Sequence, residues 1–179
     1  MIQSFFAGRF ARATGRAMLL LLSLSTLLAG PAQAELSKPL GRVILTVTGN
    51  ISGTNAEGRA EFDQAMLAAL GIHRFSTSTP WTDGAPEFEG VLLADVLSAV
   101  GARGERLDVI ALNDYSAEIP LSDLKNYPVL LAWAVNGRHL TRRDKGPLWI
   151  MYPLDAHQEL KENRINDRLV WQLTSVEVR

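Results

Sequence analysis

Residues 107–120 read LDVIALNDYSAEIP, two apolar runs separated by three consecutive polar residues, Asn113, Asp114 and Tyr115. The β-branched and apolar residues on either side predict two paired strands, residues 107–112 and 117–120. An amide, a carboxylate and a phenol held in one turn lose hydration unless they form hydrogen bonds. Their partner is either the protein's own backbone or a flat, polar ligand, and the pattern is compatible with both.

The rest of the chain extends this hairpin into a mixed fold. Further strands are expected over residues 42–48, 74–79, 129–135, 147–152 and 169–178. Helical spacing of apolar residues predicts helices over residues 61–70 and 91–100, a short helical turn at 121–125, and a polar helix or loop at 155–166. Strands outnumber helices and the two do not alternate regularly, which indicates the α+β class.

The first 34 residues have the pattern of a secretory signal peptide. Three arginines (Arg9, Arg12 and Arg16) precede an apolar run from Met18 to Ala29, which is shorter than the roughly 20 residues of a membrane span. Ala-Gln-Ala then predicts cleavage after Ala34. The arginines are not adjacent, so we expect general export of an unfolded chain to the periplasm, leaving residues 35–179 as a single domain.

Charge and cysteine content exclude several classes of function. The chain has 18 basic and 19 acidic residues, a balance that argues against nucleic-acid binding. It contains no cysteine, so it has no thiolate nucleophile, no redox pair and no soft metal ligand. The three histidines, His73, His139 and His157, share no metal-ligand spacing, and we predict no metal site.

Two other clusters combine aromatic rings with polar groups. The turn at residues 77–82 contains three threonines and a serine beside Trp81. The segment 142–153 places Arg142, Arg143 and Lys145 just before a strand that carries Trp149. Each cluster is also compatible with an ordinary turn, a core aromatic or a solvated charge run. Cations beside a flat aromatic wall would suit an anionic or heteroaromatic ligand.

Six motifs in order resemble one known family. They are TGNI (48–51), TPW-x-x-G (79–84), FEGVLLADVL (88–97), ALNDYSAEIP (111–120), LLAWAVNG (130–137) and RDKGPLWIMYP (143–153). The chain resembles the molybdopterin-binding domain of the sulfite oxidase family, in its stand-alone periplasmic, PruR-like pterin-binding branch. The resemblance covers residues 42–178 and implies a mixed β-sheet fold with short helices.

One departure from the family bears on its chemistry. The resemblance implies a molybdenum-ligating cysteine in the region of residues 76–82, where this chain has Thr77, Ser78 and Thr79. Export of an unfolded chain would also not carry a cofactor loaded in the cytoplasm. Both points argue against oxygen-atom transfer, and we predict no catalytic residue.

The resemblance implies a pocket for a reduced pterin, with molybdopterin as the alternative cofactor. In that pocket Asp114 would accept the ring's amino and N–H hydrogens, with Asn113 and Tyr115 beside it. Trp81 and Trp149 would stack on the ring. Arg142 and Lys145 would bind an anionic group.

We therefore expect a non-catalytic periplasmic protein that relays pterin availability to the periplasmic domain of a membrane cyclic di-GMP signalling enzyme. The alternatives are a molybdopterin-dependent oxidoreductase or its accessory subunit, and a scaffold domain that has lost the pocket.

Overall fold

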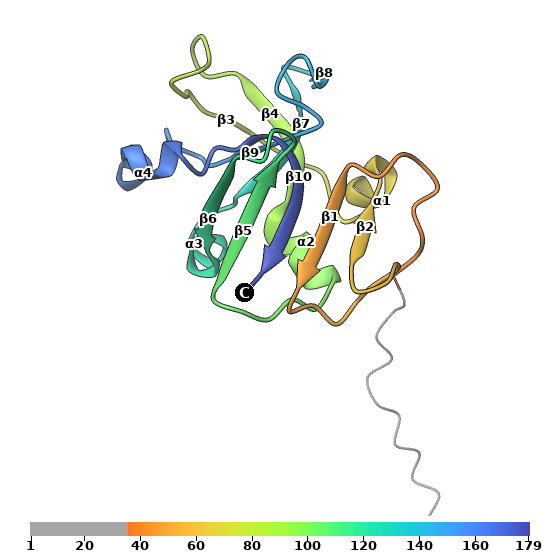
Figure 1. The fold of residues 1–179 in the computed structure, drawn as a ribbon. Coiled ribbons are helices and arrows are strands. Elements are labelled where there is room, and N and C mark those ends of the chain that lie inside the picture. The colour runs from red at the N-terminus through yellow and green to blue at the C-terminus, as the bar shows by residue number, and fades with distance from the viewer. Residues whose placement is uncertain (1–35) are drawn as a thin grey trace, which may run out of the picture. The chain divides into compact units, whose positions relative to one another are not determined.

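Strand β10 (Trp171–Val178) organises the sheet because three strands pair with it. The computed structural model describes residues 36–179, so the predicted signal peptide at residues 1–34 lies outside the described residues. Along one edge, β10 pairs antiparallel with β5 (Arg106–Ala111). On the other edge it pairs first with β9 (Leu148–Met151), antiparallel, and then with β1 (Leu45–Gly49), parallel (Figure 1).

The remaining strands extend this arrangement into one ten-stranded sheet in the order β2-β1-β10-β9-β7-β4-β3, with β5 and β6 branching from β10 and β8 from β7. The added strands are β2 (Ala60–Phe62), β3 (His73–Ser76), β4 (Glu87–Leu92), β6 (Ser116–Pro120), β7 (Leu130–Val135) and β8 (Arg138–His139). The β5–β6 pair is the predicted hairpin, with Val109 opposite Ala117.

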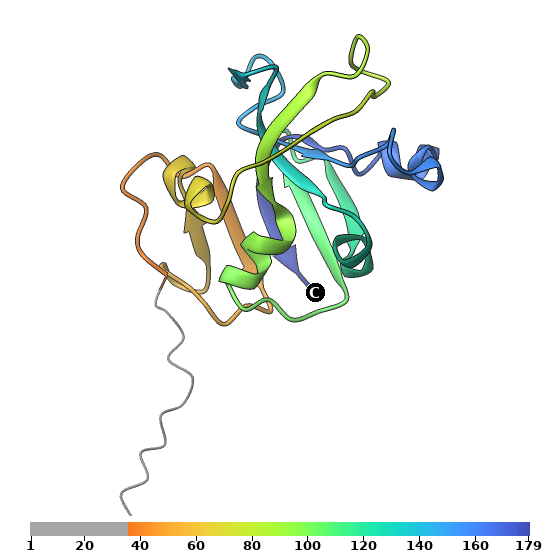
Figure 2. The same cartoon turned by 180° about the vertical axis from the view of Figure 1, so that it is seen from behind.

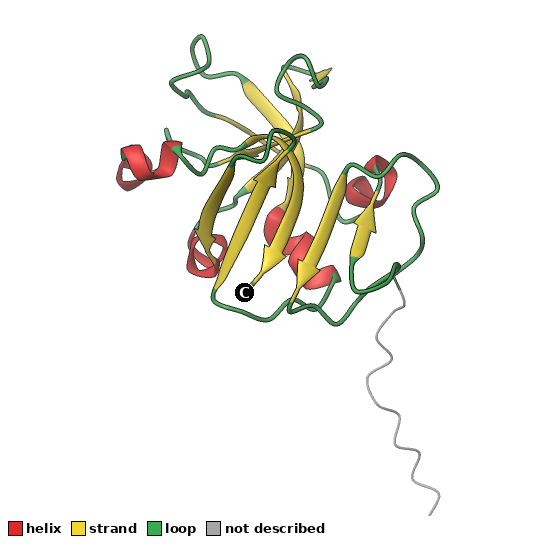
Figure 3. Cartoon of the chain, viewed as in Figure 1, coloured by secondary structure: helices red, strands yellow, loops and turns green. Residues whose placement is uncertain are grey.

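The helices are short (Figure 3). They are α1 (Gln64–Ala69), α2 (Leu93–Ala99), α3 (Leu121–Asn126), α4 (Asn163–Asn166) and a 3₁₀ turn, η1 (Gln158–Leu160). Figure 2, the view from behind, shows α2 in front of the strands, with Leu93, Val96 and Leu97 buried. No helix within residues 36–179 has the length and apolar character needed to cross a membrane.

The buried side chains form one core between the sheet and its helices. β7 and β9 contribute continuous buried runs, as expected for central strands covered on both faces. β5 and β6 alternate buried and more exposed residues because one face of the hairpin points outward.

The mixed β-sheet fold predicted from the sequence is confirmed, but the sequence did not predict strands β2, β4 and β8, and other elements differ at their ends. The predicted helix at 61–70 begins only at Gln64, because the carboxylate of Asp63 caps it by accepting from the Met66 amide at 2.9 Å. The amides of Gly41 and Leu40 also donate to this carboxylate. These hydrogen bonds together lower the pKa of Asp63, and the bond from the Met66 amide is the largest cause. The residues before it join the sheet as β2.

Candidate ligand-binding site

The turn between β5 and β6 is held by hydrogen bonds to the protein's own backbone. The Asp114 amide donates to the Ala111 carbonyl at 3.1 Å, and Asp114 adopts a positive φ of 63°. The Tyr115 amide donates to Oδ1 of Asn113 at 3.3 Å, and the Tyr115 hydroxyl donates to the Asp167 carbonyl at 3.1 Å. The side chain of Asp114 has no hydrogen-bond partner among residues 36–179, and it is exposed to solvent.

This turn forms one side of a pocket of about 230 Å³. The lining residues come from the loop after β3, from the β5–β6 turn and from the segment that leads into β10: Trp81, Ala111, Asn113, Tyr115, Asn166, Asp167, Leu169, Val170 and Trp171. Two indole rings meet edge to face in this lining, Trp81 and Trp171, with ring centroids 5.2 Å apart. The pocket is smaller than the roughly 300–1,000 Å³ of drug-sized sites, and its aromatic wall suits a small planar molecule.

A second hollow of about 260 Å³ adjoins the first, since Asn166 lines both. It lies between the loop at Ser78–Pro80 and the segment that contains Leu154 and Lys161. The two hollows together extend from the β5–β6 turn to the threonine-rich loop.

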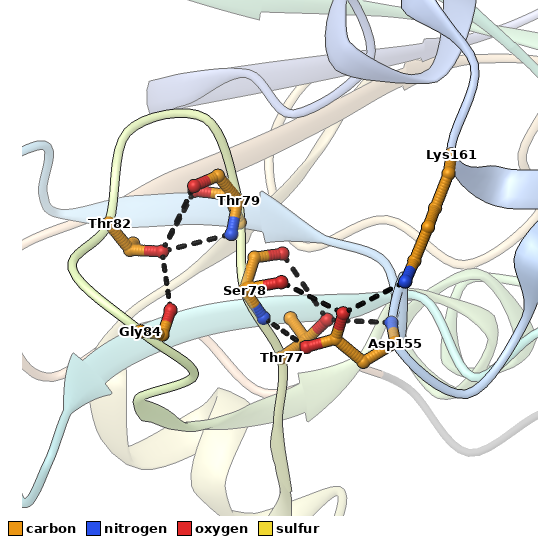
Figure 4. Close-up of polar contacts among 7 residues, drawn as sticks. All are labelled: Thr77, Ser78, Thr79, Thr82, Gly84, Asp155 and Lys161. Carbon is orange, nitrogen blue, oxygen red and sulfur yellow. Dashed lines mark hydrogen bonds and ion pairs between the residues drawn. The ribbon is translucent and has the colours of Figure 1, made fainter.

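The threonine-rich loop is tied to the segment after β9 through one carboxylate (Figure 4). The amide and the hydroxyl of Ser78 both donate to Asp155, at 2.6 and 2.8 Å, and Lys161 Nζ lies 3.4 Å from the same carboxylate. The Asp155 amide in turn donates to the hydroxyl of Thr77, which is fully buried. The pKa of Asp155 is lowered first by the Ser78 amide, then by the Ser78 hydroxyl and by Lys161.

A second set of hydrogen bonds shapes the same loop around Trp81. The Thr79 amide donates to the Thr82 hydroxyl at 2.9 Å (Figure 4). The Trp81 amide donates to the Thr79 hydroxyl at 3.1 Å. The loop thereby satisfies its own polar groups, and it presents Trp81 with 38% of its surface exposed.

Residues 163–171, which form the other side of the pocket, are held by an ion pair with helix α3. Arg168 lies 2.7 Å from Asp123 of α3, and the Tyr152 hydroxyl donates to the same carboxylate oxygen at 2.8 Å. Both charged side chains are largely buried, at 17% and 13% exposure. Burial, followed by the neighbouring Asp123, raises the pKa of the Tyr152 phenol well above its usual range, so this phenol stays protonated.

Gln172 links the β5–β6 turn to the cationic turn at residues 142–145. Its carbonyl accepts from the Leu112 amide at 2.9 Å, and its own amide donates to the Lys145 carbonyl at 2.9 Å. Its side-chain amide donates to the Arg142 carbonyl at 2.6 Å. Gln172 and Lys145 both have positive φ, 52° and 82°, so this junction holds two residues in a conformation that L-residues rarely adopt.

The structure brings three of the seven predicted site residues into the lining of the pocket, Trp81, Asn113 and Tyr115. Asp114 lies on the same turn and is exposed, but it does not line the pocket. Arg142 lines a different groove, and the ammonium of Lys145 lies 5.2 Å from the centre of the Trp149 ring.

Trp149 has a structural role that differs from the predicted one. Its side chain is 2% exposed, its ring meets Phe88 edge to face, and its Nε1 donates to the Leu169 carbonyl. Burial leaves no open face for a ligand, so the structure assigns Trp149 to the core rather than to a stacking wall.

Sequence reasoning missed the side of the pocket formed by Asn166, Asp167 and Trp171. It placed Trp171 in a final strand and residues 155–166 in a solvated segment. A signal was present, because Asn166-Asp167 beside an apolar strand repeats the Asn113-Asp114 pattern next to β5.

Comparisons with known proteins identify the family. The profile of the oxidoreductase molybdopterin-binding domain matches residues 52–156, more than half of the chain. Among solved structures, the sulfane dehydrogenase SoxCD from Paracoccus pantotrophus is similar, with a TM-score of 0.56 and 17% identity over 75% of this chain. That likeness concerns the fold, and this chain spans 37% of the length of the SoxCD chain. No curated protein sequence matches. The chain belongs to the oxidoreductase molybdopterin-binding domain family.

Proposed function

We propose that the pocket between the β5–β6 turn and residues 163–171 binds the ring of a reduced pterin, and that the protein acts without catalysis. The observation that carries the proposal is the pocket of about 230 Å³, which is lined by the rings of Trp81 and Trp171 and by Asn113 and Asn166. Flat walls with a few polar groups suit a planar heterocycle with a hydrogen-bonding edge. Membership of a molybdopterin-binding family supports a pterin-type ligand.

Two carboxylates are candidates for reading the donor edge of such a ring. Asp114 stands on the turn beside Asn113 and Tyr115, and Asp167 lines the pocket itself. A carboxylate accepts two hydrogen bonds at once, which matches an amino group next to a ring N–H. We assign this role to one of these two residues, and paired variants distinguish them.

The residues present do not fit a thiolate-ligated molybdenum. The chain contains no cysteine, and the Ser78 hydroxyl near the expected ligand position donates to Asp155. Thr77 beside it is fully buried and accepts from the Asp155 amide. Within residues 36–179 no group of three His, Cys, Asp or Glu side chains is placed to hold a metal ion. The donor set favours a metal-free pterin.

The second candidate is a molybdopterin-dependent oxidoreductase or its accessory subunit. The family match over residues 52–156 favours it, because the family is defined by molybdopterin binding. In that case oxygen ligands or another subunit would have to replace the thiolate.

Metal and pterin analysis of the purified protein separates the two candidates. We expect acid–iodine oxidation of the denatured protein to release a blue-fluorescent pterin, with molybdenum far below stoichiometric by elemental analysis. Stoichiometric molybdenum would reject the proposal in favour of the oxidoreductase. Recovery of neither would support a scaffold domain.

Variants then test the pocket. If one of the two carboxylates binds the ring, its replacement in Asp114→Asn or Asp167→Asn should lower the amount of bound pterin at least tenfold. The two ring donors would then lack their acceptor, which costs about 1–3 kcal/mol of binding free energy. Asp83→Asn, an exposed carboxylate in the loop that carries Trp81, serves as the control and should retain the pterin. If neither pocket variant loses pterin, the ligand binds elsewhere.

We further propose that the protein works in the periplasm and relays its ligand state to the periplasmic domain of a membrane cyclic di-GMP signalling enzyme. The predicted signal peptide supports export, and mass spectrometry of the periplasmic protein should give Glu35 as its first residue. A relay requires that the ligand favours one conformation or surface over another. A pull-down of the partner domain should therefore differ between pterin-loaded and pterin-free protein.

A further inference from the structure

A separate groove of about 360 Å³ lies where the sheet divides, and we call it the arginine groove. On one edge of β10, Leu173 pairs with β9 and Ser175 pairs with β1, so the partner strand changes at Thr174. The groove opens at this change of partner. It is lined by Arg42, Val43, Ile44, Thr46, Leu140, Thr141, Arg142, Pro147 and Thr174.

The charges that line the arginine groove are all positive, although the chain as a whole has a formal net charge of −1. Neither Arg42 nor Arg142 has a carboxylate partner among residues 36–179. The acid of the neighbouring turn, Asp144, accepts instead from the Thr141 hydroxyl at 2.9 Å. The groove therefore presents two arginines without a carboxylate partner beside four apolar residues and three threonines.

Both arginines project from well-anchored backbone. On one side, the amides of Leu40 and Gly41 donate to Asp63 at 2.9 and 2.7 Å, which holds the chain just before Arg42. On the other side, the Arg142 carbonyl accepts from Gln172. The turn closes tightly at Gly146, where an added Cβ would lie 2.6 Å from the Leu140 carbonyl carbon. Anchored cations lose little backbone entropy on binding.

The rim of the groove also carries a residue with unpaired backbone groups, Val43, which lies two positions before β1 begins. The Ile44 amide donates to Phe62 on the β2 side, but the amide and carbonyl of Val43 have no hydrogen-bond partner among the described residues. The side chain of Val43 is 37% exposed. Unpaired backbone groups next to a strand can pair with an added extended segment.

We propose that the arginine groove docks an extended acidic segment of a partner protein, which pairs with the backbone of Val43. Carboxylates of the segment meet Arg42 and Arg142, and alternate apolar side chains enter the space between Ile44, Leu140 and Pro147. The unpaired backbone groups favour a polypeptide, because neither a simple anion nor a membrane surface supplies the matching amide and carbonyl. This inference does not depend on the pterin pocket, which shares no lining residue with the groove.

Fluorescence anisotropy of a labelled peptide in which Glu and Val alternate tests the proposal on pterin-free full-length protein. Arg42→Glu/Arg142→Glu should weaken binding at least tenfold, because two attractive pairs become repulsive. The matched control is Arg103→Glu/Lys125→Glu, which reverses two cations in the separate hollow between α2 and α3 and should change binding less than about threefold. Arg42→Gln/Arg142→Gln repeats the test if the reversed variant does not fold.

Two further probes identify what the groove recognises. A peptide of the same sequence with alternate N-methylated amides keeps the charge but cannot pair as a strand, so it should bind at least tenfold more weakly. An equal loss of peptide affinity in the groove variant and in its control would show that only the overall charge of the protein matters. That result would overturn the proposal. Binding of phosphatidylglycerol vesicles that requires Arg42 and Arg142, without peptide binding, would overturn it in favour of a membrane surface.

Discussion

The two sides of the pocket differ in how their polar groups are used. On the side formed by residues 77–82 and 155–170, which we call the paired side, most polar side chains bind other parts of the protein: Ser78 and Lys161 bind Asp155, and Arg168 binds Asp123. On the opposite side, the turn at 113–115 is exposed, and one hydroxyl, that of Tyr115, reaches across to the Asp167 carbonyl.

This difference indicates which polar residues stabilise the structure and which remain available to bind a ligand. A buried polar group must be paired within the protein, and once paired it has little capacity left for a ligand. An exposed turn keeps its groups solvated and can exchange water for a ligand. The bonds of Thr77 and Ser78 to Asp155 therefore position the loop beside the pocket, and we propose that the turn and the aromatic rings contact the ligand.

The largest effect is expected from breaking the paired side at Asp123. Asp123→Ala leaves the charge of Arg168 and the hydroxyl of Tyr152 unpaired in a largely buried site, so we expect the free energy of unfolding to fall by about 3 kcal/mol. Urea denaturation measures this change. Ser122→Ala on the same short helix is the control, and a comparable loss there would show that α3 alone is responsible.

A smaller and pH-dependent effect is expected at Asp155. Because its pKa is lowered in the folded protein, its stabilisation is present above about pH 4, the unfolded value, and is lost as pH falls through the folded pKa. Asp155→Asn should lower stability by about 1 kcal/mol at pH 7, a value reduced by partial exposure of the carboxylate.

The urea midpoints of wild type and Asp155→Asn should therefore converge as the pH falls below about 4. A difference that stays constant with pH would show that the carboxylate's charge does not hold the loop.

Removing the Tyr115 hydrogen bond that joins the exposed turn to Asp167 should have a modest effect on stability. Tyr115→Phe loses the hydrogen bond to the Asp167 carbonyl in a half-exposed position, so we expect about 0.5 kcal/mol less stability. Thermal unfolding detects it. A loss near that of Asp123→Ala would mean that the turn supports the fold as strongly as the paired side does.

The smallest effect on stability is expected at Asp114. Its positive φ suits glycine, and its side chain has no partner among residues 36–179, so Asp114→Gly should stay within about 0.5 kcal/mol of wild type. The same variant should lose bound pterin if Asp114 reads the ligand. Unchanged pterin content would transfer that role to Asp167.

Much of the fold followed from local patterns. The β5–β6 hairpin, the buried strands β7 and β9 and the helix with Leu93, Val96 and Leu97 match their expected positions, since apolar periodicity reports burial directly. The ends of α1 and β3 did not follow, because a cap at Asp63 and the Ser78–Asp155 contact override local preference.

The candidate site was only partly predictable. The sequence marked Asn113 and Tyr115 as a polar turn beside a strand and Trp81 as an indole in a hydroxyl-rich turn, and the family resemblance implied a shared site. The structure places all three in the lining of one pocket. The predicted stacking role of Trp149 was wrong. The register of a strand decides whether a tryptophan side chain faces the core or a ligand pocket, and the sequence alone does not fix that register.

The class of fold, the absence of thiolate chemistry and the polar turn at 113–115 are properties of the sequence, because composition and periodicity are local. The pairing of Trp81 with Trp171, the joining of Ser78 to Asp155 and the separation of Arg142 from the pocket are properties of the tertiary structure. These contacts join residues about 77 to 90 positions apart, or depend on where β10 changes its partner. Only the paired sheet brings them together, and only its register decides which side chains face the same space.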